Sequence, residues 1–502
     1  MKLDHHLIIL SICALVIAIL LAIHANDWTF SCIGDEWAVF DRAMNNFRIG
    51  LINPSQIFAP VSSGVYAVHA PFITSMQSLV MAVFGQNNFG WRMSSILAFV
   101  FSVFPFYYIA RGLLNDRIAL ICSLFLLSSY YLNAEALWGY GWGQMRLYAL
   151  VATALALHFY KNTNYLSAIL LGISCSICLL AGGLCTYVPL LIFLIFLYFS
   201  CVKIIHYKYF TTLLLAILAT SKIPQMVFSK SDGLLDQIKQ LAWKTCLGPV
   251  FAAWFGGDWG INVEKTDISP FKQLALHLIN SITAPITYQG HSHFIQGNIF
   301  NPVMGSLIIF GLLLALIRSI HEIRWSFFFL AFLPALFLAG ALSPYHELAV
   351  TRLHFLVPFW ILCLGLSFSI CEKYTSKSIV LIASVILISL NIYESHKKLT
   401  VTVPAVQDFA ECAIGMKVIS YYKDKNLYFV GSGWNLVDAI VGHYELTDHV
   451  FFTKEPPSND ITKDKNTILI FKASVNPSIL SKYSCADFIS HQKKMFFVCQ
   501  EY

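Results

Sequence analysis

Long apolar blocks separated by short polar segments dominate the pattern of this chain. Most blocks hold about 17 to 20 residues, enough for a helix to cross a hydrocarbon layer of about 30 Å. The sequence therefore predicts an α-helical polytopic membrane protein with about eleven transmembrane helices and additional interfacial helices. The predicted spans are 7–23, 91–111, 117–134, 148–160, 164–181, 185–202, 209–227, 302–318, 325–341, 353–371 and 378–393.

One apolar segment, 71–85, is too short to cross, because about fifteen helical residues reach only about 22 Å. If it does not cross, the basic residues next to the other blocks collect on one side, as the positive-inside rule requires. We therefore expect 71–85 to lie in or dip into the outer interface, with the amino terminus in the cytoplasm and the carboxyl terminus outside. The basic residues concerned are Lys2, Arg111, Arg117, Lys161, Lys203, Lys208, Arg318, Arg324, Lys373 and Lys377.

Three larger segments then face outward: 26–90, about 229–300, and the tail 394–502. The tail is charged and alternates a helical stretch, Val406 to Tyr422, with short β-rich runs, so it predicts a small extracytoplasmic α/β domain after the membrane domain 1–393. The runs are 427–430, 450–453, 467–471 and 496–498. Cys485 and Cys499 lie in this polar tail at a separation that could form a disulfide, which would need an oxidising compartment.

The composition excludes an ordinary soluble enzyme. Of the 502 residues, 57% are hydrophobic and only 12% are charged, whereas soluble proteins carry about 25% charged residues. The formal net charge is only +6 and forms no basic stripe or arm, so a nucleic acid partner is disfavoured.

Five arginines on the outer side break the rule that orients the chain: Arg42, Arg48, Arg92, Arg146 and Arg352. For Arg42 and Arg48 we prefer simple pairing with headgroup phosphates. Arg146 and Arg352 sit at span ends near aromatic residues, where an uncompensated charge is costly. An anionic ligand explains these two at least as well.

Two adjacent carboxylates, Asp35 and Glu36, follow the first span. Asp35 fits an N-cap of the amphipathic interfacial helix that follows, but a cap needs only one acid. Together with the outer arginines, the pair fits transfer of a sugar from a polyprenyl phosphate to a hydroxyl. That reaction needs a base, here Asp35, and cations for the departing phosphate, here Arg146 and Arg352 with His69.

The ordered motifs resemble the glycosyltransferase C (GT-C) superfamily, in particular the protein mannosyltransferase-like branch that includes the lipid A aminoarabinose transferase. The resemblance covers roughly 1–393. It rests on the acid pair Asp35-Glu36, on His69-Ala70-Pro71, on the segment that ends at Trp91-Arg92, on Gln144-Met145-Arg146-Leu147-Tyr148, which is similar to an E-x-R-x-Y motif, and on Tyr345-His346-Glu347 through Arg352 to Pro358.

The resemblance implies an inverting transfer from a polyprenyl-phosphate sugar to a lipid, glycan or protein acceptor, with Asp35 as general base beside Glu36. It also implies that 71–85 shapes the donor cavity. The implied contacts to donor phosphate and groove are His69, Arg92, Arg146, Tyr148, Tyr345, His346 and Arg352. This chain departs from the lipid A enzyme after the acid pair, where Trp37-Ala38-Val39 replace Arg and Tyr, and at His69, which replaces Lys. The phosphate contacts are therefore expected to differ.

Other possibilities stay open. His291 and His293 with Glu36 could bind a divalent metal, although histidines in a loop are often only polar surface residues. A polymerase or ligase that uses a lipid-linked glycan would share the outer site but depend on the loop 229–300. A lipid transporter is disfavoured, because the spans are almost free of charge and no repeat is visible. Compact loops and the lack of eukaryotic retention signals favour a bacterial inner membrane.

Overall fold

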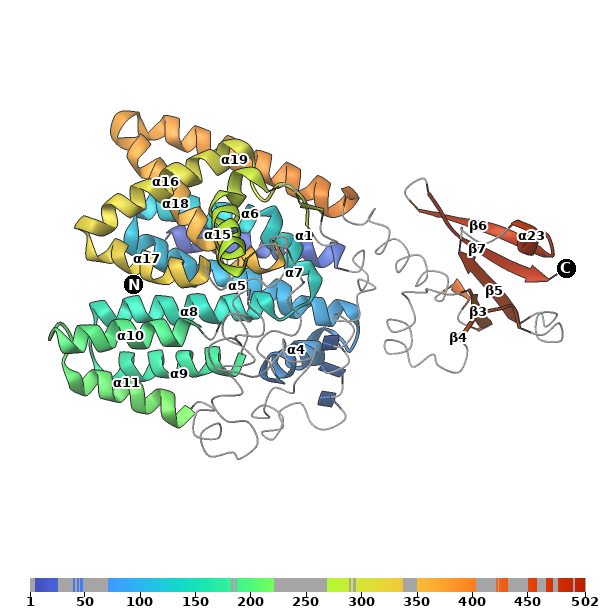
Figure 1. The fold of residues 1–502 in the computed structure, drawn as a ribbon, viewed down its shortest axis with the longest axis horizontal. Helices are drawn as coiled ribbons and strands as arrows, with labels where there is room; N and C mark the ends of the chain where they lie inside the picture. Colours follow the sequence, from blue (N-terminus) through green and yellow to red (C-terminus); the bar gives the residue numbers. More distant parts are fainter. Residues whose placement is uncertain are drawn as a thin grey trace.

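The structure is a computed structural model, drawn in Figure 1. It describes a helical part and a small sheet near the carboxyl end. The described residues are 5–25, 39–40, 43–44, 46–47, 71–181, 185, 187–220, 269–288, 290–291, 295–336, 350–402, 421–422, 424–431, 450–457, 466–472, 477–490 and 493–501.

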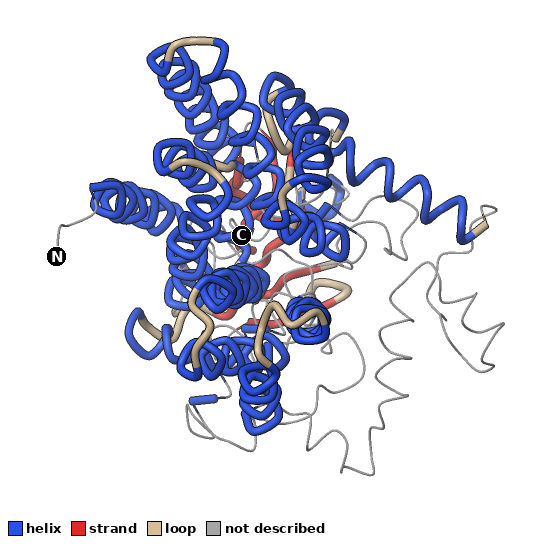
Figure 2. The backbone as a smooth tube through the Cα atoms, turned by 90° about the vertical axis from the view of Figure 1, so that its left-hand side faces the viewer, coloured by secondary structure: helices blue, strands red, loops and turns tan. Residues whose placement is uncertain are grey.

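The helical part is a bundle of long helices that run across the view of Figure 1. α15 differs, because it is seen nearly end-on in Figure 1 and from the side in Figure 2, so it lies crosswise to the bundle. The helices are α1 (His5–His24), α4 (Pro71–Phe84), α5 (Asn88–Leu113), α6 (Asp116–Ser128), α7 (Tyr130–Trp138), α8 (Trp142–Lys161), α9 (Tyr165–Ala181), α10 (Tyr187–Cys201), α11 (Tyr207–Thr220), α15 (Pro270–Thr287), α16 (Pro302–His321), α17 (Ile323–Leu336), α18 (Val357–Tyr374) and α19 (Lys377–Lys397), with the short helical turns η4 (Val350–Phe355) and η5 (Lys398–Thr402).

The chain is an integral membrane protein by the length and apolar composition of its helices. Within the described residues, five helices are long and apolar enough to cross a membrane, or six if the bent pair α6 and α7 is one span. α9, α10 and α11 are apolar but shorter, so the number of eleven spans stays a prediction. α4 has 14 residues, the same length as α11, so its expected interfacial position also stays a prediction.

α5 and α18 form the centre of the bundle. Their candidate spans are 72% and 83% buried, whereas those of α1 and α19 are 17% and 22% buried. α5 contacts α1, α4, α6, α7 and α8. Close approach of α16 to α18 requires Gly311, because a Cβ at this position would overlap the carbonyl oxygen of Cys363; small residues of this kind let membrane helices pack closely.

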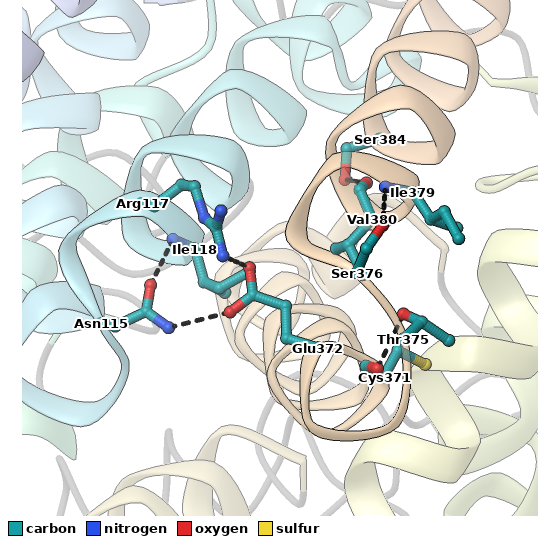
Figure 3. A network of polar contacts seen from close by, with 10 residues as sticks. All are labelled: Asn115, Arg117, Ile118, Cys371, Glu372, Thr375, Ser376, Ile379, Val380 and Ser384. Carbon is teal, nitrogen blue, oxygen red and sulfur yellow. Dashed lines mark hydrogen bonds and ion pairs between the residues drawn. The ribbon is translucent and has the colours of Figure 1, made fainter.

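One ion pair and a hydrogen bond join the start of α6 to the end of α18 on the side predicted to be cytoplasmic (Figure 3). Arg117 pairs with Glu372. Asn115 caps α6, since its side chain accepts a hydrogen bond from the backbone N–H of Ile118 at 2.9 Å, and its amide lies 3.4 Å from Glu372. These contacts hold the α5–α6 turn against α18.

The carboxyl sheet has five strands in the order β4-β3-β5-β7-β6. β4, β3 and β5 are parallel, and β7 is antiparallel to both β5 and β6. The four predicted β-rich runs coincide with β3, β4, β5 and β7, whereas β6 was not predicted. Most of the helix expected over Val406 to Tyr422 lies outside the described residues. The strands are β3 (Asn426–Val430), β4 (Val450–Thr453), β5 (Thr467–Lys472), β6 (Tyr483–Ser490) and β7 (Lys493–Glu501), with the short helix α23 (Pro477–Leu480).

A disulfide joins Cys485 on β6 to Cys499 on β7, at directly opposed positions of the two strands. The pairing that the sequence left open is therefore present. Because disulfides persist in oxidising compartments, it supports an outer location of the sheet.

We expect Cys485→Ser to destabilise the carboxyl sheet by about 3 kcal/mol, the loop-closure contribution of a disulfide that encloses about 15 residues. Proteolysis of the full chain in urea measures this loss. Counting maleimide adducts before and after reduction should give two fewer newly released thiols for Cys485→Ser than for the wild type. Cys201→Ser, at an exposed free cysteine, is the control. Equal numbers of released thiols in both proteins would contradict the disulfide.

Candidate functional site

A break between α6 and α7 shapes one end of the bundle. The two helices meet at Ser128 and Ser129 with a bend of 49°, and serine pairs are a known cause of such kinks. The Ser129 hydroxyl caps α7 by accepting from the backbone N–H of Leu132 at 3.5 Å. The freed carbonyl of Leu127 accepts from the amide of Asn133 at 3.2 Å. At the break, the backbone N–H of Leu132 and the carbonyl of Leu127 therefore both have side-chain partners.

The turn from α7 into α8 is held by side chains from α4 and α5. Gly139 ends α7 with φ +71°, a left-handed conformation that glycine adopts at low cost. Gln77 donates to its carbonyl oxygen at 2.9 Å, and Ser95 donates to that of Tyr140 at 3.0 Å. Arg92 donates to the carbonyl oxygen of Leu137. These bonds fix α7 and the start of α8 against the centre of the bundle.

A buried ion pair joins α7 to α8. Arg146 pairs through Nη1 with Oε2 of Glu135, and the two side chains are 1% and 0% exposed. The guanidinium also lies 5.9 Å from the ring centre of Phe99. Within the described part of the chain, Arg146 Nε and Nη2, Glu135 Oε1 and Gln144 Oε1 have no hydrogen-bond partner. The pair thus keeps polar atoms that a bound group could use.

Sequence reasoning missed Glu135, although a carboxylate next to a span is a signal in itself, because intramembrane charges are rare and usually functional. In the E-x-R-x-Y-like motif, Gln144 occupies the position of the acid. The structure supplies the carboxylate from Glu135, eleven residues before Arg146.

Stacked rings connect the start of α8 to η4. The Trp142 ring stacks on Tyr140 at 4.8 Å and on His354 at 5.4 Å between ring centres. His354 is fully buried, and it too was missed by sequence reasoning. This stack places the backbone of η4, which contains Arg352, beside the α7–α8 turn.

α4 lies against the same end of the bundle. Its Phe72 packs on Tyr148 of α8, with ring centres 5.8 Å apart. Ser78 of α4 accepts from the amide of Asn46 at 2.9 Å. Phe40, five residues after Asp35 along the chain, packs edge-on against Trp91 of α5 at 5.8 Å. Residues that follow the acid pair therefore pack on α4 and on α5, the helix that carries Arg92.

Of the predicted site residues, the structure describes the side chains of Arg92 on α5 and of Arg146 and Tyr148 on α8. Arg92 is buried and donates from Nε to Asn88 at 2.8 Å as well as to Leu137. For Arg352 and His291 only the backbone is described. Arg352 lies in η4. His291 lies in the two-residue strand β1 (Gly290–His291), which pairs with β2 (Gln296–Gly297). Asp35, Glu36, His69, His293, Tyr345 and His346 lie outside the described residues. The roles of all these residues stay predictions.

A metal site was expected as one possibility at Glu36, His291 and His293. Within the described residues, no group of three His, Cys, Asp or Glu side chains is arranged to bind a metal ion. Two of the three candidate ligands lie outside these residues, so the possibility stays untested.

Comparison with solved structures finds proteins with the same arrangement of helices. The oligosaccharyltransferase of Archaeoglobus fulgidus, tethered to an acceptor peptide, is 14% identical with a TM-score of 0.51; the match covers 100% of this chain and 74% of that one. The apo form of the same enzyme is 13% identical with a TM-score of 0.50, and the match covers 94% of this chain and 70% of that one. ArnT from Cupriavidus metallidurans, bound to undecaprenyl phosphate, is 12% identical with a TM-score of 0.42, and the match covers 98% of this chain and 97% of that one. No protein-family model and no curated protein sequence matches the chain. At these identities the likeness to the oligosaccharyltransferase establishes the fold.

Removing one partner of the Glu135–Arg146 pair should strongly destabilise the protein. We expect Glu135→Gln to cost about 3–5 kcal/mol, because it leaves a buried charge without its counter-ion. The double variant Glu135→Gln with Arg146→Met should recover much of this loss. Denaturant unfolding in detergent micelles measures both.

The exposed pair Arg111–Asp116, with side chains 45% and 52% exposed, is the control for this prediction. Asp116→Asn should change the stability by no more than about 1 kcal/mol, because solvent screens such pairs. A loss for Glu135→Gln as small as that for Asp116→Asn would contradict a buried pair.

Proposed function

Because this chain has the fold of the GT-C glycosyltransferases, we propose that it is an integral membrane glycosyltransferase that uses a polyprenyl-phosphate sugar. The acceptor is a hydroxyl group of an envelope lipid, glycan or protein. One observation carries the proposal: Arg92 and the Glu135–Arg146 pair gather at the end of the bundle that α4 covers, where the residues after the acid pair also pack.

On the donor side, Arg146 supplies the positive charge for the departing phosphate. Its Nε and Nη2 remain as donors, and hydrogen bonds from arginine to phosphate oxygens are strong and directional. Glu135 fixes the guanidinium in place. We propose that Arg92, Arg352, His69, Tyr345 and His346 complete the contacts to the donor.

Tyr148 and α4 line the groove for the prenyl chain in this proposal. The contact of Phe72 with Tyr148 gives an apolar surface on α8, the helix that also carries Arg146. A lipid-linked sugar needs both surfaces side by side, because its phosphate is charged and its chain is hydrocarbon.

For the chemical step, Asp35 accepts the proton of the acceptor hydroxyl, with Glu36 beside it. The hydroxyl oxygen then attacks the anomeric carbon from the face opposite the phosphate. The bond between the anomeric carbon and the phosphate oxygen breaks, and polyprenyl phosphate leaves with the electron pair. The configuration at the anomeric carbon is therefore inverted. The arginines stabilise the charge that develops on the leaving phosphate.

We place this site on the extracytoplasmic side of a bacterial inner membrane, with the amino terminus in the cytoplasm. The disulfide of the carboxyl sheet supports an oxidising location for the tail that follows α19.

Transfer of radiolabelled sugar in membranes tests the proposal. A panel of polyprenyl-phosphate sugars and one lipid-linked oligosaccharide are offered to the wild type, Asp35→Asn and Arg146→Lys at matched expression. We expect transfer of a single sugar by the wild type. Asp35→Asn should lower the rate by about 10²- to 10⁴-fold, the usual contribution of a general base.

Arg146→Lys should raise the donor KM, because a lysine cannot reproduce the guanidinium fork. Asp424→Asn, at an exposed residue of the carboxyl segment, is the control for removal of a carboxylate. Full activity of Asp35→Asn would remove the base assignment. Transfer only from the oligosaccharide donor would favour the ligase alternative.

A further inference from the structure

α19, the last long helix that the structure describes, carries a polar face toward its carboxyl end. Asn391 and Ser395 are buried on this helix, and Glu394 and Lys398 are half-buried. Their spacing of three and four residues places them on one side. The preceding turns are apolar and expose residues such as Ile382 and Val385. Polar residues in a lipid-exposed helix are costly, so this face, which we call the α19 clamp, needs an explanation.

Two members of the clamp converge on one atom of the α6–α7 break. The amide of Asn391 donates to the carbonyl oxygen of Ser128 at 2.9 Å and lies 3.1 Å from its hydroxyl. The hydroxyl of Ser395 donates to the same carbonyl oxygen at 3.0 Å.

The other two members bind neighbouring segments. Lys398 donates to the carbonyl oxygen of Asn298 at 3.0 Å and lies over the ring of Tyr130, the first residue of α7, at 4.5 Å. Glu394 lies 3.5 Å from the amide of Asn301, which caps α16. The clamp therefore holds the start of α7 from a helix that is far away in the sequence.

The bonds of Asn391 and Ser395 replace a bond that a continuous helix would make. In an unbroken helix, the carbonyl of Ser128 would accept from the backbone N–H of Leu132. Here that N–H is bonded to the Ser129 hydroxyl instead. In an apolar surrounding, an unpaired carbonyl costs several kcal/mol. Without the two α19 donors, a straight helix would satisfy Ser128 better than the bent one.

The bend sets the position of Glu135. α7 is only nine residues long, and Glu135 lies in its second turn, where it meets Arg146 of α8. A straighter α6–α7 would aim this part of α7 along the axis of α6, away from its place against α8.

We propose that Asn391 and Ser395 are positioning residues of the donor site, which act by holding the α6–α7 bend and so keep Glu135 on Arg146. This inference rests on the proposed function for its consequence in the reaction, but not for the coupling between the clamp and the ion pair. The two parts are therefore tested separately.

A double-mutant cycle on the full chain tests the coupling without any activity. Asn391→Leu, Glu135→Gln and the double variant are compared by their apparent melting temperatures in detergent micelles. We expect Asn391→Leu to lower the melting temperature when it is introduced into the wild type. Introduced into the Glu135→Gln variant, the same substitution should cause a shift less than about half as large, because the effects of residues in one network are not additive. Equal shifts in both backgrounds would overturn the proposal.

Milder variants cover the case in which Asn391→Leu does not fold. Ser395→Ala takes its place in the cycle, and Ser395→Thr, which keeps the hydroxyl, should restore wild-type behaviour. Ser389→Ala is the matched control, because it removes the same hydroxyl from an exposed position of the same helix. A shift for Ser389→Ala as large as that for Ser395→Ala would count against the clamp.

Kinetics test the consequence for the reaction. A positioning role predicts that Ser395→Ala raises the KM for the polyprenyl-phosphate sugar about three- to tenfold and leaves the acceptor KM unchanged. A merely structural role would lower the amount of active enzyme, and so the apparent kcat, without changing either KM; that result would overturn the assignment. If the wild type transfers no sugar, the proposed function fails, and the melting cycle still decides on the clamp.

Discussion

The carbonyl oxygen of Ser128 is the atom on which the arrangement of this site depends. In an apolar bundle every backbone polar group must find a partner within the protein, and a broken helix frees several at once. The chain meets this constraint with Asn133 for Leu127, and with Asn391 and Ser395 for Ser128. Because these partners exist, α7 can leave the direction of α6 and reach α8.

Charge is distributed differently at the two ends of the bundle. At the end near Arg117 and Glu372, ion pairs join helix termini and are partly exposed. At the other end, Glu135 and Arg146 are fully buried. A buried pair stabilises little by itself relative to apolar side chains of similar size. The central helix α5 supports both partners, since it contacts α7 and α8.

The sequence predicts what depends on local pattern and fails where partners are distant. Apolar length located most of the helices, but not α15, which lies in the segment expected as an outer loop, nor the break between α6 and α7. Short β-rich runs located β3, β4, β5 and β7, but β6 mixes Ser, Cys and Asp and becomes visible only as the neighbour of β7. Arg146 was singled out by its charge, whereas its partner Glu135 needed the bend of α7. The function of Asn391 depends on a carbonyl 263 residues away, which no local pattern encodes.

The peripheral position of α19 has a mechanical consequence. Only 22% of its candidate span is buried, so most of its length is open to surrounding lipid, while its carboxyl end is bonded to the α6–α7 break. A helix adapts to a thicker or thinner bilayer by changing its tilt, at a cost of fractions of a kcal/mol per Å. Tilting α19 would pull on Ser128 and on the start of α7. Through this connection, a change in bilayer thickness would alter the geometry of Glu135 and Arg146, so the membrane would help to shape the site as well as solvate it.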